Sequence, residues 1–389
     1  MVDDSKSGAA GFWVWFQDED PISSPLGSEP DRLNGRARPA DSADVVEAIR
    51  LRSEGRDEEA LDRLQRAAAE GDADALLLCG QICFELGELG AAAEWYARLQ
   101  ELQPGHPLAS LNEGLCLGRL RRWDEARECL GRAVMVNPDR PEPWFLLGVA
   151  LLHVGRAAES RPCFDRVLKL KQDYAPALFG QAVALHLEGR PEEALQLYEL
   201  LLEDQPEKEE LLTNALAAAR KAKDAGRVNG FASRLLAVKP EAEAALKALA
   251  SLAIDAGDPE QAAAWLERLV DAGALDGDQP LTESLALCLM GGNKREPERK
   301  AWKALLQAVP SHEYGLFRLA TLEHQLGDTA SAAEMFARCV ELRDDWPEAW
   351  WNLAGCRWKM GDRDGAMQAL KTARQLDPAL ATALASAAR

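Results

Sequence analysis

The sequence predicts an all-α protein, a solenoid of about ten short helix pairs, and three observations lead to this fold class. Amphipathic helix pairs recur along the chain, as in the stretch from Pro347 to Pro378, where Gly361 separates two helices. The pattern returns every 34 residues. No stretch shows the convincing period-2 alternation of a strand. A solenoid grows without closing a core, so we expect one elongated domain.

The stretch from Pro347 to Pro378 shows the pattern of one repeat. Apolar and packed positions recur at spacings of three and four residues, as on one face of a helix. These faces consist of Trp350, Leu353, Ala354 and Arg357 in the first helix and of Ala366, Leu370 and Ala373 in the second. Pro378 ends the unit, because its ring cannot continue a helix.

This pattern resembles the tetratricopeptide repeat, a 34-residue helix-turn-helix with Trp, Leu, Gly, Tyr, Ala, Phe and Pro at set positions. Arg357 stands where that family prefers an aromatic residue. The matching residues are Trp350, Leu353, Gly361, Ala366 and Pro378. The resemblance implies a right-handed superhelix whose concave groove binds peptides.

The 34-residue repeat continues through about nine tenths of the chain. It forms two series of repeats, and the second is shifted by two residues because of an insertion between Ala272 and Pro280. We count nine units from Ala73 and a tenth, shorter unit around Gly55. The positions that repeat the pattern include Gly87, Ala92 and Tyr96; Ala126; Trp144, Leu147, Gly148, Gly155 and Phe164; Gly189, Ala194 and Tyr198; Gly257 and Ala262; and Gly327, Ala332 and Phe336.

Two stretches depart from the regular pattern. In the unit from Glu209 to Ala242, Lys223 stands where the turn glycine belongs, and Gly226 and Gly230 follow it. Glycine inside a helix costs about 1 kcal/mol relative to alanine, so we expect the second helix there to be short or to start late. The two-residue insertion predicts a break in the solenoid, residues 41–378, near residues 273–280. The Ala-rich residues 379–389 should cap the last repeat.

Charge and composition exclude several classes of partner. The chain has 45 basic and 64 acidic residues, a formal net charge of -19, which disfavours nucleic acid and anionic lipid surfaces. No apolar run reaches the roughly 20 residues that span a bilayer. The apolar residues 11–16 are too short for a signal-peptide core. We therefore expect a cytoplasmic protein without membrane insertion.

We expect no catalytic residue, metal or cofactor. The eight cysteines form no CxxC motif, and the five histidines are scattered over different repeats. Buried thiols in a reducing compartment explain this cysteine usage. Almost every residue belongs to a repeat, which leaves no room for a catalytic domain, so the protein is not expected to be an enzyme.

Residues 1–40 lack helical periodicity and are predicted to be a disordered tail. Within it, an aromatic segment with Trp13, Trp15 and Phe16 as anchors precedes three acidic residues, Asp18 to Asp20. One interpretation is that these aromatics pack on the first repeat. The other is that they bind the groove, in the same chain or in a second copy as a tail-swapped dimer. The acidic residues would then face Arg119 or Arg122.

The inner face of the first helices holds the candidate binding residues. Their fifth and ninth positions point away from the packed seam, and many are apolar where a pure spacer would be polar. The apolar and aromatic candidates are Leu77, Leu111, Phe145, Val149, Phe179, Val183, Phe317 and Trp351, and the sixth position adds Asn112, Asn214 and Asn352. Asparagines there hold the peptide backbone in some members of the family. Packing between successive first helices is the alternative explanation.

Three functions follow as hypotheses. The first is an adaptor that binds an apolar or aromatic peptide segment of a protein partner. The second is a structural spacer subunit of a larger assembly, and the third is a regulatory domain of an enzyme. The family's basic clamp for terminal carboxylates is not reproduced, because Lys247 stands alone. The sequence leaves the oligomeric state open.

Overall fold

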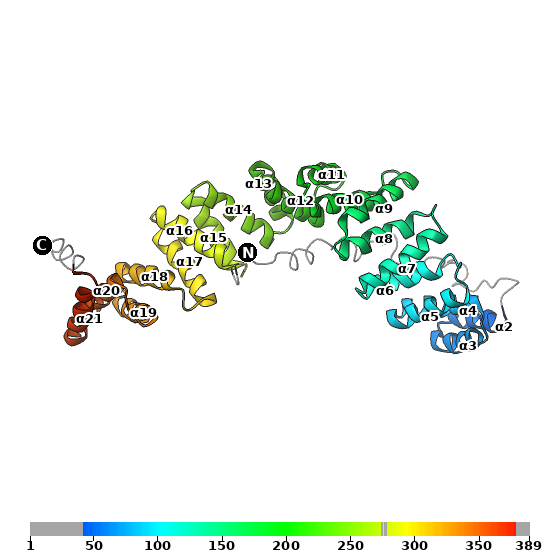
Figure 1. Ribbon diagram of the computed structural model, residues 1–389, viewed down its shortest axis with the longest axis horizontal. Helices are drawn as coiled ribbons and strands as arrows, with labels where there is room; N and C mark the ends of the chain where they lie inside the picture. The colour runs from blue at the N-terminus through cyan, green and yellow to red at the C-terminus, as the bar shows by residue number, and fades with distance from the viewer. Residues whose placement is uncertain (1–41, 274, 276–277, 379–389) are drawn as a thin grey trace. The chain divides into compact units, whose positions relative to one another are not determined.

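The computed structural model describes residues 42–273, 275 and 278–378 (Figure 1). Twenty α-helices, α2 to α21, make ten consecutive pairs in these ranges, and no strand occurs in them. The predicted all-α repeat fold is therefore confirmed. The predicted tail, residues 1–40, and the predicted cap, residues 379–389, lie outside the described residues. The right-handed superhelix stays a prediction.

The chain divides into two units, which meet in the sequence between Asp224 and Ala225. Unit 1 contains eleven of the described helices. They are α2 (Ala43–Ser53), α3 (Asp57–Ala69), α4 (Ala73–Glu85), α5 (Leu89–Leu102), α6 (Ala109–Arg119), α7 (Trp123–Val136), α8 (Pro141–His153), α9 (Ala157–Leu170), α10 (Ala175–Leu187), α11 (Pro191–Asp204) and α12 (Glu209–Ala222).

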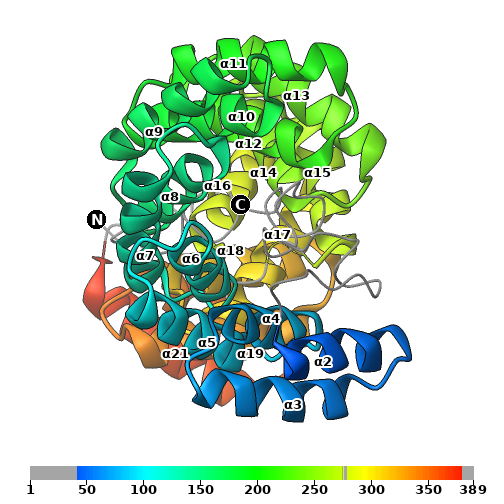
Figure 2. The ribbon, with the colours of Figure 1, turned by 90° about the vertical axis from the view of Figure 1, so that its right-hand side faces the viewer.

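Unit 2 contains the other nine described helices. They are α13 (Ala225–Val238), α14 (Glu243–Asp255), α15 (Pro259–Asp271), α16 (Gln279–Gly291), α17 (Arg295–Ala308), α18 (Glu313–Leu326), α19 (Thr329–Leu342), α20 (Pro347–Lys359) and α21 (Arg363–Leu376). Within each unit, a helix packs mainly on the helices just before and after it in the chain. Figures 1 and 2 show this for α2 and α3, which run side by side.

Short polar side chains define where several helices begin. The Asp72 carboxylate accepts a hydrogen bond from the Ala75 N–H (3.1 Å) at the start of α4, which satisfies a backbone donor that the helix leaves free. Aspartates cap α15, α16, α19 and α21 in the same way through Asp258, Asp278, Asp328 and Asp362.

The helices of a pair interlock through a small residue on one and a large residue on the other. A Cβ atom built on Gly148 of α8 would lie 2.8 Å from the Phe164 ring of α9. Gly180 of α10, in the next repeat, approaches the same ring, at 2.5 Å. Phe164 is fully buried between them. One aromatic ring therefore joins two successive repeats, and only glycine leaves room for it.

The turn between paired helices needs one residue in the left-handed region. Gly87 takes it with φ 80°, and Lys223 takes it with φ 58°. The Asp224 N–H then bonds to the Ala219 carbonyl (3.1 Å), and α13 begins at Ala225 with a full 14 residues. The expectation of a short or late second helix was wrong, because Lys223 accepts the strained conformation and the turn closes at the regular place.

The two-residue insertion lies between α15 and α16. Leu275 is buried in the apolar core that α14 to α17 share, and α16 packs on both α14 and α15. Residues 274, 276 and 277 lie outside the described residues. A break near residues 273–280 stays a prediction.

Candidate functional site

The structure buries most of the candidate binding residues on the inner face. Eight of the eleven are buried, and only Phe317, Trp351 and Asn352 keep part of their side chain accessible. The buried ones are Leu77, Leu111, Asn112, Phe145, Val149, Phe179, Val183 and Asn214. In this conformation, the part of the candidate surface that a ligand can reach lies on unit 2.

Packing between repeats accounts for two of the aromatic fifth positions. The Phe145 ring meets the Tyr174 ring edge to face, with centroids 5.7 Å apart, and Tyr174 immediately precedes α10. Phe317 likewise stacks on Trp346, which immediately precedes α20, with centroids 4.6 Å apart. In both pairs the partner stands 29 residues later in the sequence, just before the first helix of the next repeat.

The same relation holds where the fifth position is charged. Lys247 pairs with Asp278 (Nζ to Oδ2, 3.1 Å), 31 residues later because of the two-residue insertion. Glu283 faces His312 (Oε1 to Nε2, 3.7 Å), again 29 residues later. We call these four contacts the junction pairs. Each pair matches an aromatic residue with an aromatic residue, or a charged residue with a complementary polar group. The sequence shows these matches only when a residue of one repeat is compared with a residue of the next.

The asparagines at the sixth position differ in their surroundings. Asn112 is fully buried, and Asn352 is half-buried. Asn214 is buried and donates from Nδ2 to the Glu210 carbonyl (2.7 Å), while its Oδ1 has no hydrogen-bond partner among the described residues. Only Asn352 lies beside accessible aromatic side chains of the same surface. A peptide-holding ladder of asparagines stays a prediction.

We call three half-buried aromatic residues of unit 2 the accessible aromatic cluster: Phe317 and Trp346, whose rings stack, and Trp351 of α20. Phe317 also packs edge to face on the buried Phe336 ring, with centroids 5.6 Å apart, and this contact holds the Phe317 ring in place. The guanidinium of Arg343 lies 4.2 Å from the centroid of Trp346. The cluster is thus a firmly packed apolar surface with a cation at its edge, which suits an aromatic or aliphatic side chain.

The two cations proposed to face the tail already have partners among the described residues. Trp13, Trp15 and Phe16 lie outside the described residues. Arg122 binds Glu125 through both ends of its guanidinium, at 2.6 Å each. Arg119 lies over the Phe84 ring, 5.2 Å from its centroid. Arg122 would therefore have to leave Glu125 to bind an incoming carboxylate.

Burial keeps two histidines and five cysteines of the described part uncharged near neutral pH. Burial lowers the pKa of His153 and of His186 to about 4, helped by the nearby Arg121 and Lys221 respectively. Burial also raises the thiol pKa of five cysteines to about 12, namely Cys79, Cys116, Cys129, Cys163 and Cys339. No group of three or more His, Cys, Asp or Glu residues in the described ranges could hold a metal ion.

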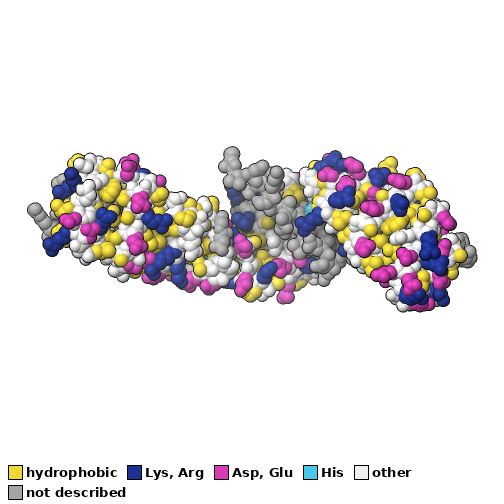
Figure 3. Space-filling view, turned by 90° about the horizontal axis from the view of Figure 1, so that it is seen from below, with side chains coloured by type: hydrophobic (Ala, Val, Ile, Leu, Met, Phe, Trp, Pro, Cys, Tyr) yellow, Lys and Arg dark blue, Asp and Glu magenta, His cyan; other side chains and the backbone are white. Residues whose placement is uncertain are grey.

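Charge is spread over the surface in both signs. On the face that Figure 3 shows, basic and acidic side chains alternate over the described residues. None of the helices in the described ranges combines the length and the apolar character that crossing a membrane requires.

Comparison with family models gives matches over much of the chain. Models described as tetratricopeptide repeat match residues 45–107, 111–170, 154–209, 241–268 and 323–388. A comparison with curated proteins found no match.

Solved structures of repeat proteins also resemble this chain. The C-terminal part of a TPR repeat-containing protein from Cytophaga hutchinsonii is 14% identical, with a TM-score of 0.52 over 62% of this chain and 98% of that one. A tetratricopeptide repeat protein from Parabacteroides merdae is 15% identical, with a TM-score of 0.45 over 63% of this chain and 97% of that one. YrrB, a TPR protein with an unusual peptide-binding site, is 19% identical, with a TM-score of 0.43 over 47% of this chain and 95% of that one. At these identities the likeness concerns the fold alone.

Proposed function

The chain belongs to the tetratricopeptide repeat family, a family of protein-interaction scaffolds, and on this basis we propose that it binds an apolar or aromatic peptide segment of a partner protein. The observation that carries the proposal is the partly accessible stacked pair of Phe317 and Trp346 on unit 2, with the partly accessible Trp351 on the adjoining helix α20. Burying an aromatic side chain on such a surface removes about 150 to 250 Å² of the ring from water. Main-chain hydrogen bonds, for example to Asn352, would add direction to the contact.

The chain carries a segment of this chemistry itself. Residues 12–16 are aromatic or apolar, and Asp18 to Asp20 follow them. As part of the same proposal, this segment competes with the partner for the groove, in the same chain or in a second copy. A tethered segment acts at an effective concentration near millimolar, so even weak binding would occupy the site.

A peptide titration in the full-length chain tests this. The variant Trp13→Ser, Trp15→Ser, Phe16→Ser removes the competing anchors, and a fluorescent peptide of residues 12–20 reports binding by anisotropy. We expect the variant to bind this peptide about tenfold more tightly than the natural chain, because the tethered competitor is gone. A variant that does not bind the peptide would remove the support for both the surface and the competitor.

A pair of indole substitutions locates the binding surface. Trp351→Ala, added to the same variant, removes one ring of the aromatic cluster and should weaken binding of the peptide. Trp265→Ala is the matched control. It also removes a half-buried indole, but from α15, which is the second helix of its repeat. Equal weakening by both substitutions would argue against a site on the cluster.

The alternative of a structural spacer subunit makes a different prediction for the natural complex. A spacer is bound permanently, so the complex has fixed stoichiometry, whereas an adaptor exchanges its partner. Native mass measurements on the purified complex decide between them. We propose no catalytic role; burial lowers the pKa of His153 and of His186 to about 4 and raises that of Cys79 to about 12, so these three side chains stay uncharged near neutral pH. The eight free cysteines support the expectation of a reducing compartment such as the cytoplasm.

A further inference from the structure

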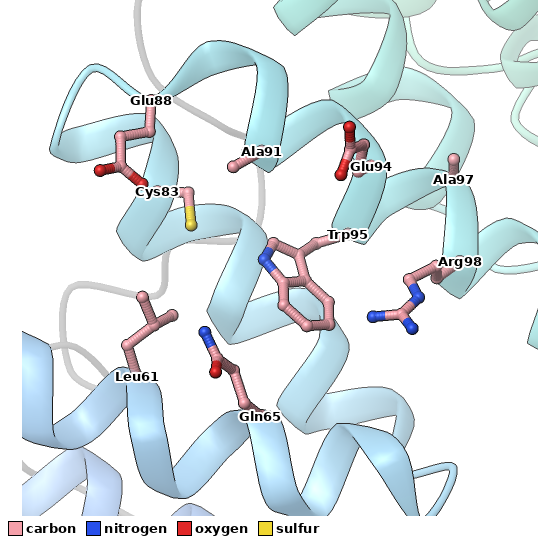
Figure 4. Close-up of a pocket in the computed structure, with 9 residues that line it drawn as sticks. All are labelled: Leu61, Gln65, Cys83, Glu88, Ala91, Glu94, Trp95, Ala97 and Arg98. Carbon is pink, nitrogen blue, oxygen red and sulfur yellow. The ribbon is translucent and has the colours of Figure 1, made fainter.

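A second candidate surface lies on unit 1, between second helices of the first two repeats. A pocket of about 600 Å³ opens between α3 and α5 (Figure 4). Leu61 and Gln65 of α3 form one side, and Trp95 of α5 forms the other. The pocket is separate from the fifth positions of the first helices, so a ligand in it would bind independently of the proposed peptide site. Its volume falls in the range of ligand pockets in proteins, about 300 to 1,000 Å³.

Apolar side chains line the pocket together with the polar ends of Gln65 and Arg98. Leu61, Ala91 and Trp95 are half-buried and expose hydrocarbon to the space between the helices. Cys83 closes the pocket from α4, and burial raises the pKa of its thiol, with Glu88 adding to the shift. The sulfur therefore stays an uncharged SH group. The interior suits a hydrocarbon chain rather than a charged head group.

The rim of the pocket is acidic. Glu88 and Glu94 stand on opposite sides of Ala91 in Figure 4, and both are exposed. Neither carboxylate takes part in an ion pair or a side-chain hydrogen bond among the described residues, whereas the neighbouring Glu85 is paired with Arg52. Two unpaired negative charges thus flank an apolar interior.

The indole of Trp95 already holds a cation. The guanidinium carbon of Arg98 lies 4.8 Å from the centroid of the Trp95 ring. This is a cation–π contact, and an incoming arginine or lysine would make the same kind of contact with the Trp95 ring. Long cationic side chains also bury their hydrocarbon stems while their charged ends stay in water.

We propose that this pocket is a docking site for a basic segment of a partner protein. The stem of an arginine or lysine lies against Leu61 and Trp95, and the cationic groups of the segment pair with Glu88 and Glu94. The net charge of -19 supports this choice, because it attracts basic segments from a distance and repels acidic ones. Such a contact weakens as salt screens it.

Fluorine NMR on the full chain tests the site. The eleven tryptophans are replaced by 5-fluorotryptophan, and Trp95→Phe assigns the Trp95 resonance. The probe is the peptide Ac-AARAARAA-NH2, and the same peptide with glutamine in place of arginine is its control. We expect the arginine peptide alone to shift the Trp95 resonance. Trp265, which also has an arginine over its ring, Arg268 at 5.2 Å, serves as the internal control and should not respond.

Matched charge variants then test the acidic rim. Glu88→Gln with Glu94→Gln should weaken binding of the arginine peptide about tenfold, on the order expected for two partly exposed charge contacts. Glu70→Gln with Glu101→Gln removes the same charge from exposed positions near the ends of α3 and α5, outside the pocket lining, and should leave binding unchanged. Raising the salt from about 0.05 to about 0.5 M should weaken binding to the natural chain.

Several results would overturn the proposal. These are an unchanged Trp95 resonance, an equal response to the glutamine peptide, or equal weakening by both pairs of variants. The chain also has arginines of its own before α2, Arg32, Arg36 and Arg38. If the peptide binds only after these three are replaced by alanine, the chain's own segment is the occupant and a partner segment is not.

Discussion

A single ring, that of Phe164, shows how much one residue decides in this chain. It fills the space that the missing side chains of Gly148 and Gly180 leave, so this repeat depends on a glycine in its own first helix and on another in the next. Gly230 in α13 has no such role, because it is exposed and a Cβ there would meet nothing within 4 Å. Substitution by alanine should therefore lower the stability of the protein at Gly148 and raise it at Gly230.

Gly148→Ala should lower the free energy of unfolding by about 1 to 3 kcal/mol, because overpacking against a buried ring outweighs the better helix propensity of alanine. Gly230→Ala is the matched control and should raise it by up to about 1 kcal/mol, because only the propensity changes. Urea titrations of both variants provide the measurement. A Gly148→Ala variant as stable as the natural chain would show that Phe164 can move aside.

At the scale of helices, α17 and α18 meet through buried charges. Glu323 of α18 is 2% exposed, and its Oε1 accepts hydrogen bonds from Arg299 (Nε, 2.8 Å) and Lys303 (Nζ, 2.9 Å) of α17. Burial on its own would raise the pKa of Glu323, but the hydrogen bonds from the two cations outweigh it and hold the pKa below its usual range. The carboxylate therefore stabilises this helix pair only while it is ionised.

The sign of the pH effect depends on the direction of this shift. Because the folded-state pKa is lowered, the stabilisation by Glu323 is complete above the unfolded pKa, near about 4.3, and is lost as the pH falls through the folded pKa. Glu323→Gln should cost about 1 to 3 kcal/mol at pH 7, and the difference from the natural chain should shrink at pH 3. Glu341→Gln on α19, an exposed site, is the control. A cost that does not depend on pH would contradict an ionic role.

The sequence predicted these elements better than it predicted their contacts. Its 34-residue period placed the helix pairs and the turn glycines, because both depend on residues close together in the chain. Arg121, Lys223 and Asn293 are the exceptions, since these three residues adopt the left-handed conformation that the pattern reserves for glycine. The candidate residues of the inner face lie on first helices, but the burial of Phe145 depends on Tyr174, and no period within one repeat reveals that partner.

At the scale of the molecule, each unit is held together by contacts between neighbours in the chain. The helices pack mainly on those just before and after them, and no contact of distant helices within a unit closes a common core among the described residues. The stability of such an array is approximately a sum over repeats and their junctions. A local loss should therefore stay local.

Phe145→Ala tests this locality, since it removes a fully buried ring at a cost of about 3 to 5 kcal/mol. Hydrogen exchange should become faster in α8, α9 and α10 and stay unchanged in α2 and α3 of the same unit. Phe317→Ala is a useful comparison, because this half-buried ring should cost less. Uniformly faster exchange throughout unit 1 would mean that the unit unfolds as one cooperative body.

The junction pairs also limit how this chain can change over time. Repeat proteins gain and lose repeats by duplication and deletion, and these events are harmless only when every boundary accepts every repeat. Here the boundaries differ, since Phe145 meets Tyr174 and Phe317 meets Trp346, while Lys247 meets Asp278. A copy of one repeat inserted at another boundary would set an aromatic ring against an unpaired charge. The contacts at the boundaries therefore restrict the order of the repeats. A repeat can be duplicated or moved without loss of its junction pair only together with its neighbour.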